Sequence, residues 1–275
     1  MQTPNLKAEY TTEPVLIAKT NSAAQGTRTA DDRVAADLRA FERSGDPEFS
    51  NKFLETEARG KIAEWRRLAE GGVPAAQVLL AYCFRDGCGV GLDDGEAVKW
   101  FRKAADAGEA RGMTGLGTMY QHLRVVDVHD TEVGHKEAVK YYRKAANAGD
   151  PGGMILLGNA FDEGIGAGIA GKVDFKEALQ WYKKAADAGY PSGEYLVGRM
   201  YHSGRGVQQD LKEAVKWYTK AADAGLFLSM SMLATMYEYG RGVEKDEKMA
   251  LEWYEKSLQA GGGDLERAAI KRLRK

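Results

Sequence analysis

Residues 195–225, YLVGRMYHSGRGVQQDLKEAVKWYTKAADAG, decide the fold of this 275-residue chain, because parts of this stretch recur along most of the sequence. The closing KAADAG returns at 103–108 and 184–189, as KAANAG at 144–149, and more loosely as KSLQAG at 256–261 and RLAEGG at 67–72. The final glycines of these copies lie 36, 41, 40, 36 and 36 residues apart. Self-similarity at this period predicts a stack of helix pairs, two of which carry insertions.

Each of these glycines marks the end of a helix, here named helix B of its repeat, since glycine enters the left-handed C-cap conformation without a Cβ penalty. Before it, an alanine, two adjacent aromatic residues and two small residues recur at spacings of three, four and seven. In the fourth copy these are Ala214, Trp217, Tyr218, Ala221 and Ala222. The sequence therefore predicts helices that bury one face at this register.

A second stripe follows each glycine and predicts a helix A, which precedes helix B of the same repeat. Counting from the glycine, place 8 is aliphatic, place 9 is glycine or alanine and place 12 is aromatic, as in Val197, Gly198 and Tyr201. Glycine inside a helix costs about 1 kcal/mol relative to alanine, so its recurrence at place 9 indicates a tight contact. We expect two backbones to approach closely there, with the aromatic residue filling the space between neighbouring helices.

The segment 195–225 resembles the Sel1-like repeat almost position for position, including its turn residues Gly204, Gly206, Val207 and Asp210. The next copy has Gly240, Gly242, Val243 and Asp246 at the same positions, and the resemblance covers 73–261 closely and 54–72 loosely. It implies an all-α fold, a right-handed superhelix of antiparallel helix pairs related to tetratricopeptide repeats. It also implies an adaptor or scaffold role with neither catalytic residues nor a cofactor.

Two connections between helix A and helix B depart from this pattern. The second repeat reads QHLRVVDVHDTEVGHKEA over 121–138 and lacks the glycine turn, whereas the third, over 163–178, keeps Gly164 and Gly166 but adds four residues. Insertions of this kind lie along one edge of a solenoid, often the edge that binds a partner.

The chain divides into four expected parts. Residues 1–30 lack a helical stripe and predict a flexible tail, with a docking peptide as the alternative. Residues 31–72 predict capping helices and a partial repeat, with a second helix beginning at Pro47. Five full repeats follow over 73–261, and residues 262–275 predict a closing helix with a basic last turn.

Composition narrows the possible partners and the compartment. The 39 Lys and Arg residues against 40 Asp and Glu give a net charge of −1, which provides no attraction to nucleic acid or to an anionic membrane. No run of about 18 apolar residues and no export signal occur, so we expect a cytoplasmic protein without membrane insertion. Reduced thiols are then expected at Cys83, in helix A, and at Cys88, in an exposed turn, although a disulfide between them is the alternative in an oxidising compartment.

Sequence motifs for catalysis are absent, so we expect that the chain is not an enzyme and carries no cofactor. Three of the four histidines, His122, His129 and His135, share the unusual connection of the second repeat with acidic residues such as Asp127. They lack the three- or four-residue spacing of a zinc pair, and a metal-dependent enzyme is the weakest hypothesis. GIGAGIAG at 164–171 has neither the preceding strand nor the Lys-Ser/Thr ending of a phosphate loop.

We expect a partner protein or peptide to bind a concave groove lined by the A helices, at the places that the packing stripe leaves outward. These residues are Tyr82, Arg85, Arg111, Gln121, His122, Asn159, Asp162, Tyr195, Arg199, His202, Glu238 and Tyr239. Their variation from repeat to repeat fits one irregular partner, but solvent-facing positions that drift would vary in the same way. Tyrosine and arginine are frequent interface anchors, which singles out Tyr82, Arg111, Tyr195 and Arg199.

A second hypothesis is a regulatory, inhibitory or immunity-type subunit. Such a protein would bind an enzyme or toxin through its convex side and the 121–136 loop. The sequence identifies no partner, and it leaves the oligomeric state open, with a monomer as the simpler expectation.

Overall fold

The computed structural model describes residues 29–42, 47–125, 128–165 and 173–274. Over these residues the chain forms thirteen α-helices and no strand, which confirms the all-α prediction. The helices are α1 (Ala30–Glu42), α2 (Pro47–Glu70), α3 (Pro74–Asp86), α4 (Asp94–Asp106), α5 (Ala110–Gln121), α6 (Thr131–Asn147), α7 (Pro151–Glu163), α8 (Phe175–Asp187), α9 (Pro191–Ser203), α10 (Leu211–Asp223), α11 (Phe227–Tyr239), α12 (Glu247–Gln259) and α13 (Asp264–Leu273).

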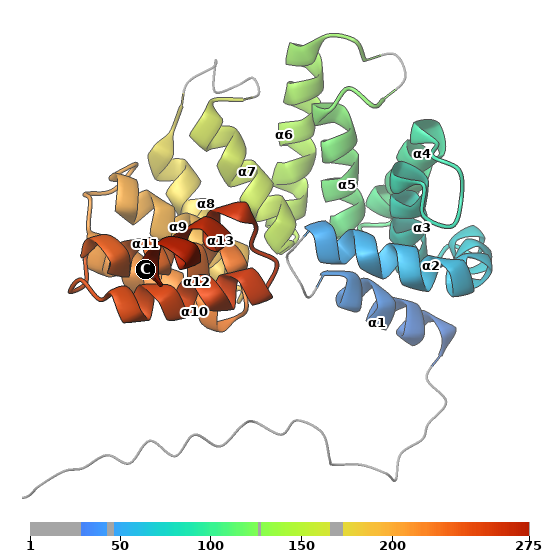
Figure 1. Ribbon diagram of the computed structural model, residues 1–275. Coiled ribbons are helices and arrows are strands. Elements are labelled where there is room, and N and C mark those ends of the chain that lie inside the picture. The colour runs from blue at the N-terminus through green and yellow to red at the C-terminus, as the bar shows by residue number, and fades with distance from the viewer. Residues whose placement is uncertain (1–28, 43–46, 126–127, 166–172, 275) are drawn as a thin grey trace, which may run out of the picture.

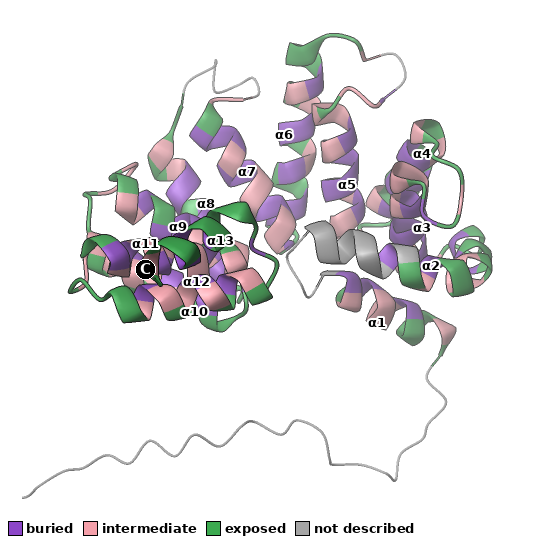
Figure 2. Ribbon diagram, in the orientation of Figure 1, coloured by how far each residue is buried: buried purple, intermediate pink, exposed green. Residues whose placement is uncertain are grey.

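The helices follow one another along a curve from α1 to α13 (Figure 1), and each contacts mainly its neighbours in sequence. Helix A of the five repeats is α3, α5, α7, α9 and α11, and helix B is α4, α6, α8, α10 and α12. Consecutive A helices from α3 to α9 also contact one another, whereas consecutive B helices have at most marginal contact. The A helices therefore lie on the inside of the curve. Buried residues line the facing sides of the helices along the whole curve (Figure 2).

The sequence sets both ends of each helix. Every B helix begins after an aspartate whose carboxylate accepts a backbone amide of the first turn, as Asp210 does from Glu213 at 3.0 Å. This satisfies an amide that has no partner within the helix. The helices α3, α7, α9 and α11 end at a left-handed glycine, such as Gly204 with φ of 73°. The predicted helix pairs are thus separated by the predicted breaks.

The glycines at place 9 make room for a tyrosine ring of the same repeat. A Cβ atom on Gly158 would lie 2.5 Å from Cε1 of Tyr182, and one on Gly198 would lie 2.7 Å from Tyr218. The contact at place 9 is therefore between a backbone and a ring, whereas the sequence had suggested two backbones. Two backbones approach closely at place 4 instead, where a Cβ on Gly193 would lie 2.7 Å from the amide nitrogen of Ala186.

The second repeat differs from its sequence-based expectation. Helix α6 has 17 residues, against 13 in the other B helices, and begins at Thr131. Much of the expected 121–136 loop is therefore an additional helical turn, capped by Asp130, which accepts the amide of Val133 at 3.0 Å. Leu123 occupies the place of the left-handed glycine in the other repeats and adopts the same conformation, with φ of 54°.

Helices also form at both ends of the five repeats. In α1 the side chains of Val34, Leu38 and Phe41 are buried, and Leu54 and Trp65 of α2 join the same core. The predicted tail up to residue 28 lies outside the described residues. Helix α13 closes the other end against α12.

Both cysteines are buried, and no disulfide joins them within the described residues. Burial raises the pKa of the Cys83 thiol to about 12. Cys88, expected in an exposed position, is only 7% exposed because its turn packs against the N-terminal core. The exposure predicted for Cys88 is therefore wrong.

Candidate protein-binding surface

The twelve expected groove residues all lie on the A helices or at their ends. Their exposure differs widely. His122, Arg199 and Tyr239 are exposed, whereas Asp162 and Glu238 are buried. The remaining seven are half-buried: Tyr82, Arg85, Arg111, Gln121, Asn159, Tyr195 and His202.

Four of these residues bind the hydroxyl group of a tyrosine from helix B of their own repeat. Tyr142 donates to Oε1 of Gln121 at 2.6 Å, and Tyr182 donates to Oδ1 of Asn159 at 2.7 Å. Tyr254 donates to Oε2 of Glu238 at 2.9 Å, and Tyr218 lies 3.4 Å from Nδ1 of His202. Each ring is almost completely buried, so its hydroxyl requires a polar partner where it reaches the inner face.

Ion pairs hold the two buried carboxylates. Asp162 lies 2.9 Å from the guanidinium of Arg205 in the next repeat, and Glu238 lies 2.5 Å from Arg272 of α13. Both pairs link successive units of the solenoid. The carboxylates of Asp162 and Glu238 therefore help to hold neighbouring units together. The sequence did not predict this role, because the residue type at place 13 differs from repeat to repeat.

The N-terminal expected residues are partly covered. The ring of Tyr82 packs 4.7 Å from Phe41 of α1 and 5.0 Å from Phe101, and burial raises its pKa to about 12. Arg85 lies over the Tyr82 ring at 4.6 Å. Arg111 is 3.8 Å from the carboxylate of Asp150, and burial lowers the pKa of its guanidinium despite that carboxylate.

The central part of helix α9 presents an open cluster. Tyr195 and His202 flank the ring of Tyr218 at centroid distances of 5.8 and 6.2 Å, and Arg199, between them in sequence, is exposed. Burial, followed by the charge of Arg241, lowers the pKa of His202, which favours the neutral imidazole. The cluster therefore combines Tyr195, His202 and the exposed Arg199 on α9, and the first two lie against the buried ring of Tyr218 from α10.

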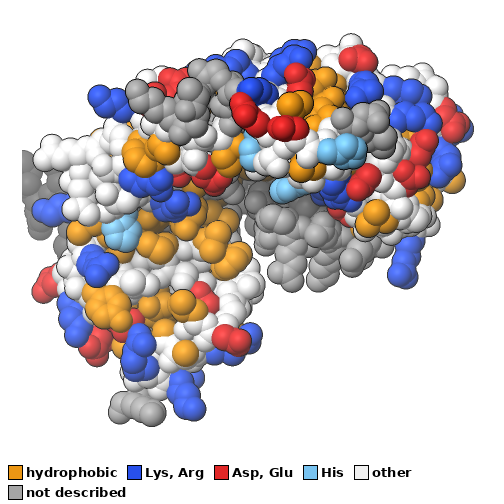
Figure 3. All heavy atoms as spheres, turned by 90° about the horizontal axis from the view of Figure 1, so that it is seen from above, with side chains coloured by type: hydrophobic (Ala, Val, Ile, Leu, Met, Phe, Trp, Pro, Cys, Tyr) orange, Lys and Arg blue, Asp and Glu red, His pale blue; other side chains and the backbone are white. Residues whose placement is uncertain are grey.

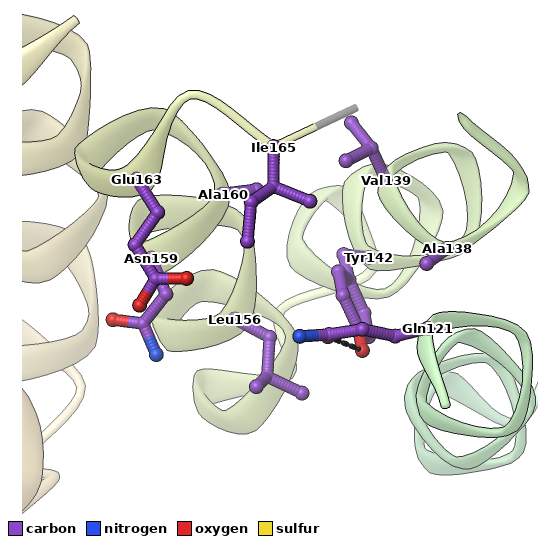
Figure 4. A pocket seen from close by; sticks show the side chains of 9 residues that line it. All are labelled: Gln121, Ala138, Val139, Tyr142, Leu156, Asn159, Ala160, Glu163 and Ile165. Atoms are coloured by element: carbon purple, nitrogen blue, oxygen red, sulfur yellow. Dashed lines mark hydrogen bonds between the residues drawn. The ribbon is translucent and has the colours of Figure 1, made fainter. Parts of the chain in front are cut away.

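A small cavity of about 50 Å³ lies between the second and third repeats. Gln121 and Asn159, two of the expected groove residues, line it from opposite sides (Figure 4). The other lining residues are Ala138, Val139, Tyr142, Leu156, Ala160, Glu163 and Ile165. The sequence did not predict this cavity, because lining residues such as Ala138 and Tyr142 belong to the repeated packing pattern and carry no charge.

Surface charge is mixed on the face shown in Figure 3, where basic and acidic side chains alternate without a large patch of one sign. This agrees with the net charge of −1. Within the described residues, no three His, Cys, Asp or Glu side chains gather as metal ligands. His122 and His129 are exposed, His135 lies on α6 and not in a loop, and Asp127 falls outside the described residues.

These features define a class of protein, an all-α solenoid built from five helix pairs whose inner face carries aromatic, charged and amide side chains. The family model of the Sel1 repeat matches residues 74–109, 110–150, 151–190, 191–226 and 228–262, and the chain belongs to this family. Sel1 repeats generally mediate protein–protein interaction and form a non-catalytic scaffold family. The resemblance to the Sel1-like repeat and the predicted superhelical fold are therefore confirmed.

Solved structures with the same fold support this assignment. A Sel1 repeat protein from Oxalobacter formigenes is 30% identical, with 88% of this chain and 86% of that one covered and a TM-score of 0.62. A protective antigen of uropathogenic Escherichia coli strains, with an SLR fold, is 31% identical with a TM-score of 0.63, and covers 90% of this chain, which spans 48% of the antigen. An immunity protein from Pseudomonas aeruginosa shares the fold at 20% identity and a TM-score of 0.56, with 83% and 82% covered.

The search of curated proteins gave no match. Over the described residues, none of the helices combines the length and apolar character needed to cross a membrane.

Proposed function

We propose that this chain is a scaffold that holds a partner protein or peptide against the inner face of its A helices. The observation that carries the proposal is the open cluster on α9, where Arg199 is exposed beside the half-buried rings of Tyr195 and His202. Tyrosine, arginine and partly covered aromatic surfaces are typical of the anchors in protein interfaces. Family membership supports a binding role without specifying the partner.

The structure sharpens the choice of test variants. Tyr82 packs against Phe41 and Phe101, so replacing it would disturb the core as well as the surface. Arg199 and Tyr239 are exposed on α9 and α11, and their removal leaves the described core contacts in place. We therefore choose Arg199→Ala combined with Tyr239→Ala. The matched control is Arg102→Ala with Lys248→Ala, two exposed cations on the B helices.

The full-length chain serves as bait for affinity capture from native lysate, followed by titration of the purified captured protein against both double variants. Anchors that cost about 2 kcal/mol each on truncation weaken binding by more than tenfold, and the control leaves it unchanged. Circular dichroism checks that the helices persist. Equal weakening by the control, or undiminished binding by the inner-face variant, would contradict the proposal.

One observation favours a second site for a partner. Val133 is 48% exposed on the additional turn of α6, a feature that the other B helices lack. A regulatory or immunity-type subunit that uses its convex side would bind here. Val133→Asp tests this directly: a loss of partner binding in this variant, with the Arg199 and Tyr239 variant unaffected, would favour the second site.

A further inference from the structure

At two boundaries between repeats, an arginine at place 16 links the repeat to the one before it. Arg124 of the second repeat donates to the backbone carbonyl oxygen of Arg85 at 2.9 Å, and Arg205 of the fourth donates to that of Asp162 at 3.3 Å. Both acceptors stand at place 13, in the last turn of helix A of the preceding repeat. The last carbonyl groups of a helix have no partner within the helix, so a guanidinium from the next repeat satisfies them.

The third repeat lacks this link. Its place 16 is Ile165, and the acceptor place 13 of the preceding repeat is Gln121. Over the described part of the chain, no donor reaches the backbone carbonyl of Gln121. The cavity of about 50 Å³ lies at this boundary, with Gln121 and Ile165 both in its wall (Figure 4).

The walls of the cavity combine aliphatic side chains with a carboxylate. Val139, Leu156 and Ile165 supply aliphatic surface, and the side chain of Glu163 lines the same cavity. Glu163 is exposed and has no ion pair within the described residues, unlike Asp162 beside it. The cavity also lies at the C-terminal ends of α5 and α7, where the helix dipoles favour a cation.

This combination favours arginine over lysine, since several acceptors surround one position. An arginine side chain has an apolar stem and a planar guanidinium that donates to a carboxylate and to carbonyl oxygens together. The cavity is far smaller than the roughly 300–1,000 Å³ of sites for drug-sized ligands, which suits the end of a single side chain. Glutamine, asparagine or an acidic side chain would leave Glu163 without a counter-charge.

We propose that this cavity receives an arginine side chain of the partner protein, whose guanidinium takes the place that Arg124 and Arg205 fill at the neighbouring repeat boundaries. The proposal rests on the protein-binding function above and names the chemistry of one contact. The partner's arginine would pair with the Glu163 carboxylate and donate to the backbone carbonyl oxygen of Gln121. At this boundary the partner would therefore supply the arginine that the chain has replaced with Ile165.

The first test uses blocked arginine, N-acetyl-arginine methylamide, with the citrulline analogue as an isosteric uncharged control. Titration into the full-length chain is followed by ¹H–¹⁵N NMR. Arginine should shift the side-chain amide of Gln121 and the backbone amide of Gly164, with a dissociation constant on the order of 1–10 mM for so small a ligand. Citrulline should bind at least fivefold more weakly, since the charge-assisted pair is lost.

Two variants localise the effect. Ile165→Arg supplies the missing link from within and should abolish the arginine shifts, whereas the matched Ile165→Leu leaves the cavity open and keeps them. Glu163→Gln should weaken arginine binding at least fivefold. Equal shifts from arginine and citrulline, shifts that persist in Ile165→Arg, or no shift at Gln121 at saturation would each overturn the proposal.

Binding measurements with the purified partner distinguish the arginine site from the scaffold function. If the Arg199 and Tyr239 variant loses the partner while Ile165→Arg binds it as tightly as the unmodified chain, the scaffold function stands and the arginine site fails. If Ile165→Arg weakens the partner at least tenfold and Ile165→Leu does not, both stand.

Discussion

Arg205 binds both the backbone carbonyl oxygen and the carboxylate of Asp162, at 3.3 and 2.9 Å, and so joins the fourth repeat to the third. The Asp162 side chain is only 10% exposed in this pair. Replacing Arg205 with methionine keeps the stem but leaves a nearly buried carboxylate without its counter-ion. We expect a loss of about 1–3 kcal/mol in the free energy of unfolding, measured by urea denaturation.

An exposed ion pair provides the contrast. Arg267 and Asp264 are 3.2 Å apart, but both side chains are largely exposed. Arg267→Met should change stability by less than about 0.5 kcal/mol, because exposed pairs are screened by water and salt. Equal losses in the two variants would show that the link between repeats contributes nothing specific.

A glycine at place 9 sets the distance between the two helices of a repeat. In Gly158→Ala the new Cβ would lie 2.5 Å from the rigid ring of Tyr182, and overpacking of this kind costs about 1–3 kcal/mol. Alanine regains about 1 kcal/mol of helix propensity, so the net loss is smaller than the packing term. We expect a melting temperature lower by a few degrees, measured by circular dichroism at 222 nm.

Gly60→Ala is the matched control for that substitution. Gly60 is also inside a helix, but no atom lies within 4 Å of a Cβ built on it. Only helix propensity then remains, and the variant should be more stable by up to about 1 kcal/mol. Opposite signs for the two substitutions would demonstrate the steric origin, and stabilisation in both would refute it.

Repetition explains what the sequence could predict. The helix ends, the aromatic pairs and the glycine turns recur at one register, so the period alone gives five helix pairs and their order. Place 9 was identified as a tight contact, although its partner is a ring such as that of Tyr182. The sequence could not distinguish a backbone from a ring because both require a missing Cβ.

The candidate surface was harder to predict because its residues share a property and not an identity. Gln121, Asn159, His202 and Glu238 differ in charge and size, yet each can accept a hydrogen bond from a buried tyrosine. Three of these residues stand at place 13, and Asn159 stands at place 10. In the first repeat helix B has Phe101 instead of tyrosine, and the side chain of Arg85, at place 13, has no acceptor atom. A tyrosine on helix B thus occurs together with an acceptor side chain on helix A of the same repeat. This pairing was the sequence signal that could have predicted these hydrogen bonds.

The second repeat escaped prediction for a local reason. Its connection lacks the glycine turn, so a long loop was expected, whereas Asp130 caps an additional turn of helix. Leu123 enters the left-handed region without being glycine, at a cost of about 1–2 kcal/mol that packing must offset. The Leu123 side chain fills the space left by Gly134, where a Cβ would lie 2.6 Å from Cδ2 of Leu123.

Helix capping allows a prediction about the B helices. The carboxylate of Asp210 accepts the amide of Glu213 at 3.0 Å at the start of α10. Asp210→Ala should lower the free energy of unfolding by about 1 kcal/mol, whereas Asp210→Asn keeps the acceptor and most of the stability. Urea denaturation of both variants checks this. Equal losses would indicate that charge and not the cap is what matters.

The buried tyrosines predict sensitivity to high pH. Burial raises the pKa of Tyr142 and of Tyr254 to about 12, and it also raises the pKa of Tyr182 and Tyr218. Unfolded tyrosine ionises near about pH 10, so the unfolded chain releases protons that the folded chain retains. The stabilisation is complete below about pH 10 and is lost as the pH rises toward the folded pKa values, by about 1.4 kcal/mol per pH unit for each tyrosine.

We therefore expect alkaline unfolding between about pH 10 and 12, in which tyrosinate absorbance at 295 nm and the loss of helical circular dichroism coincide. Tyr182→Phe removes one titrating group and one hydrogen bond to Asn159. It should be less stable at pH 7, by about 1 kcal/mol, yet lose stability less steeply above pH 10. Tyrosinate absorbance that rises well before the helices melt would mean that these hydroxyls ionise within the folded chain, contrary to their burial.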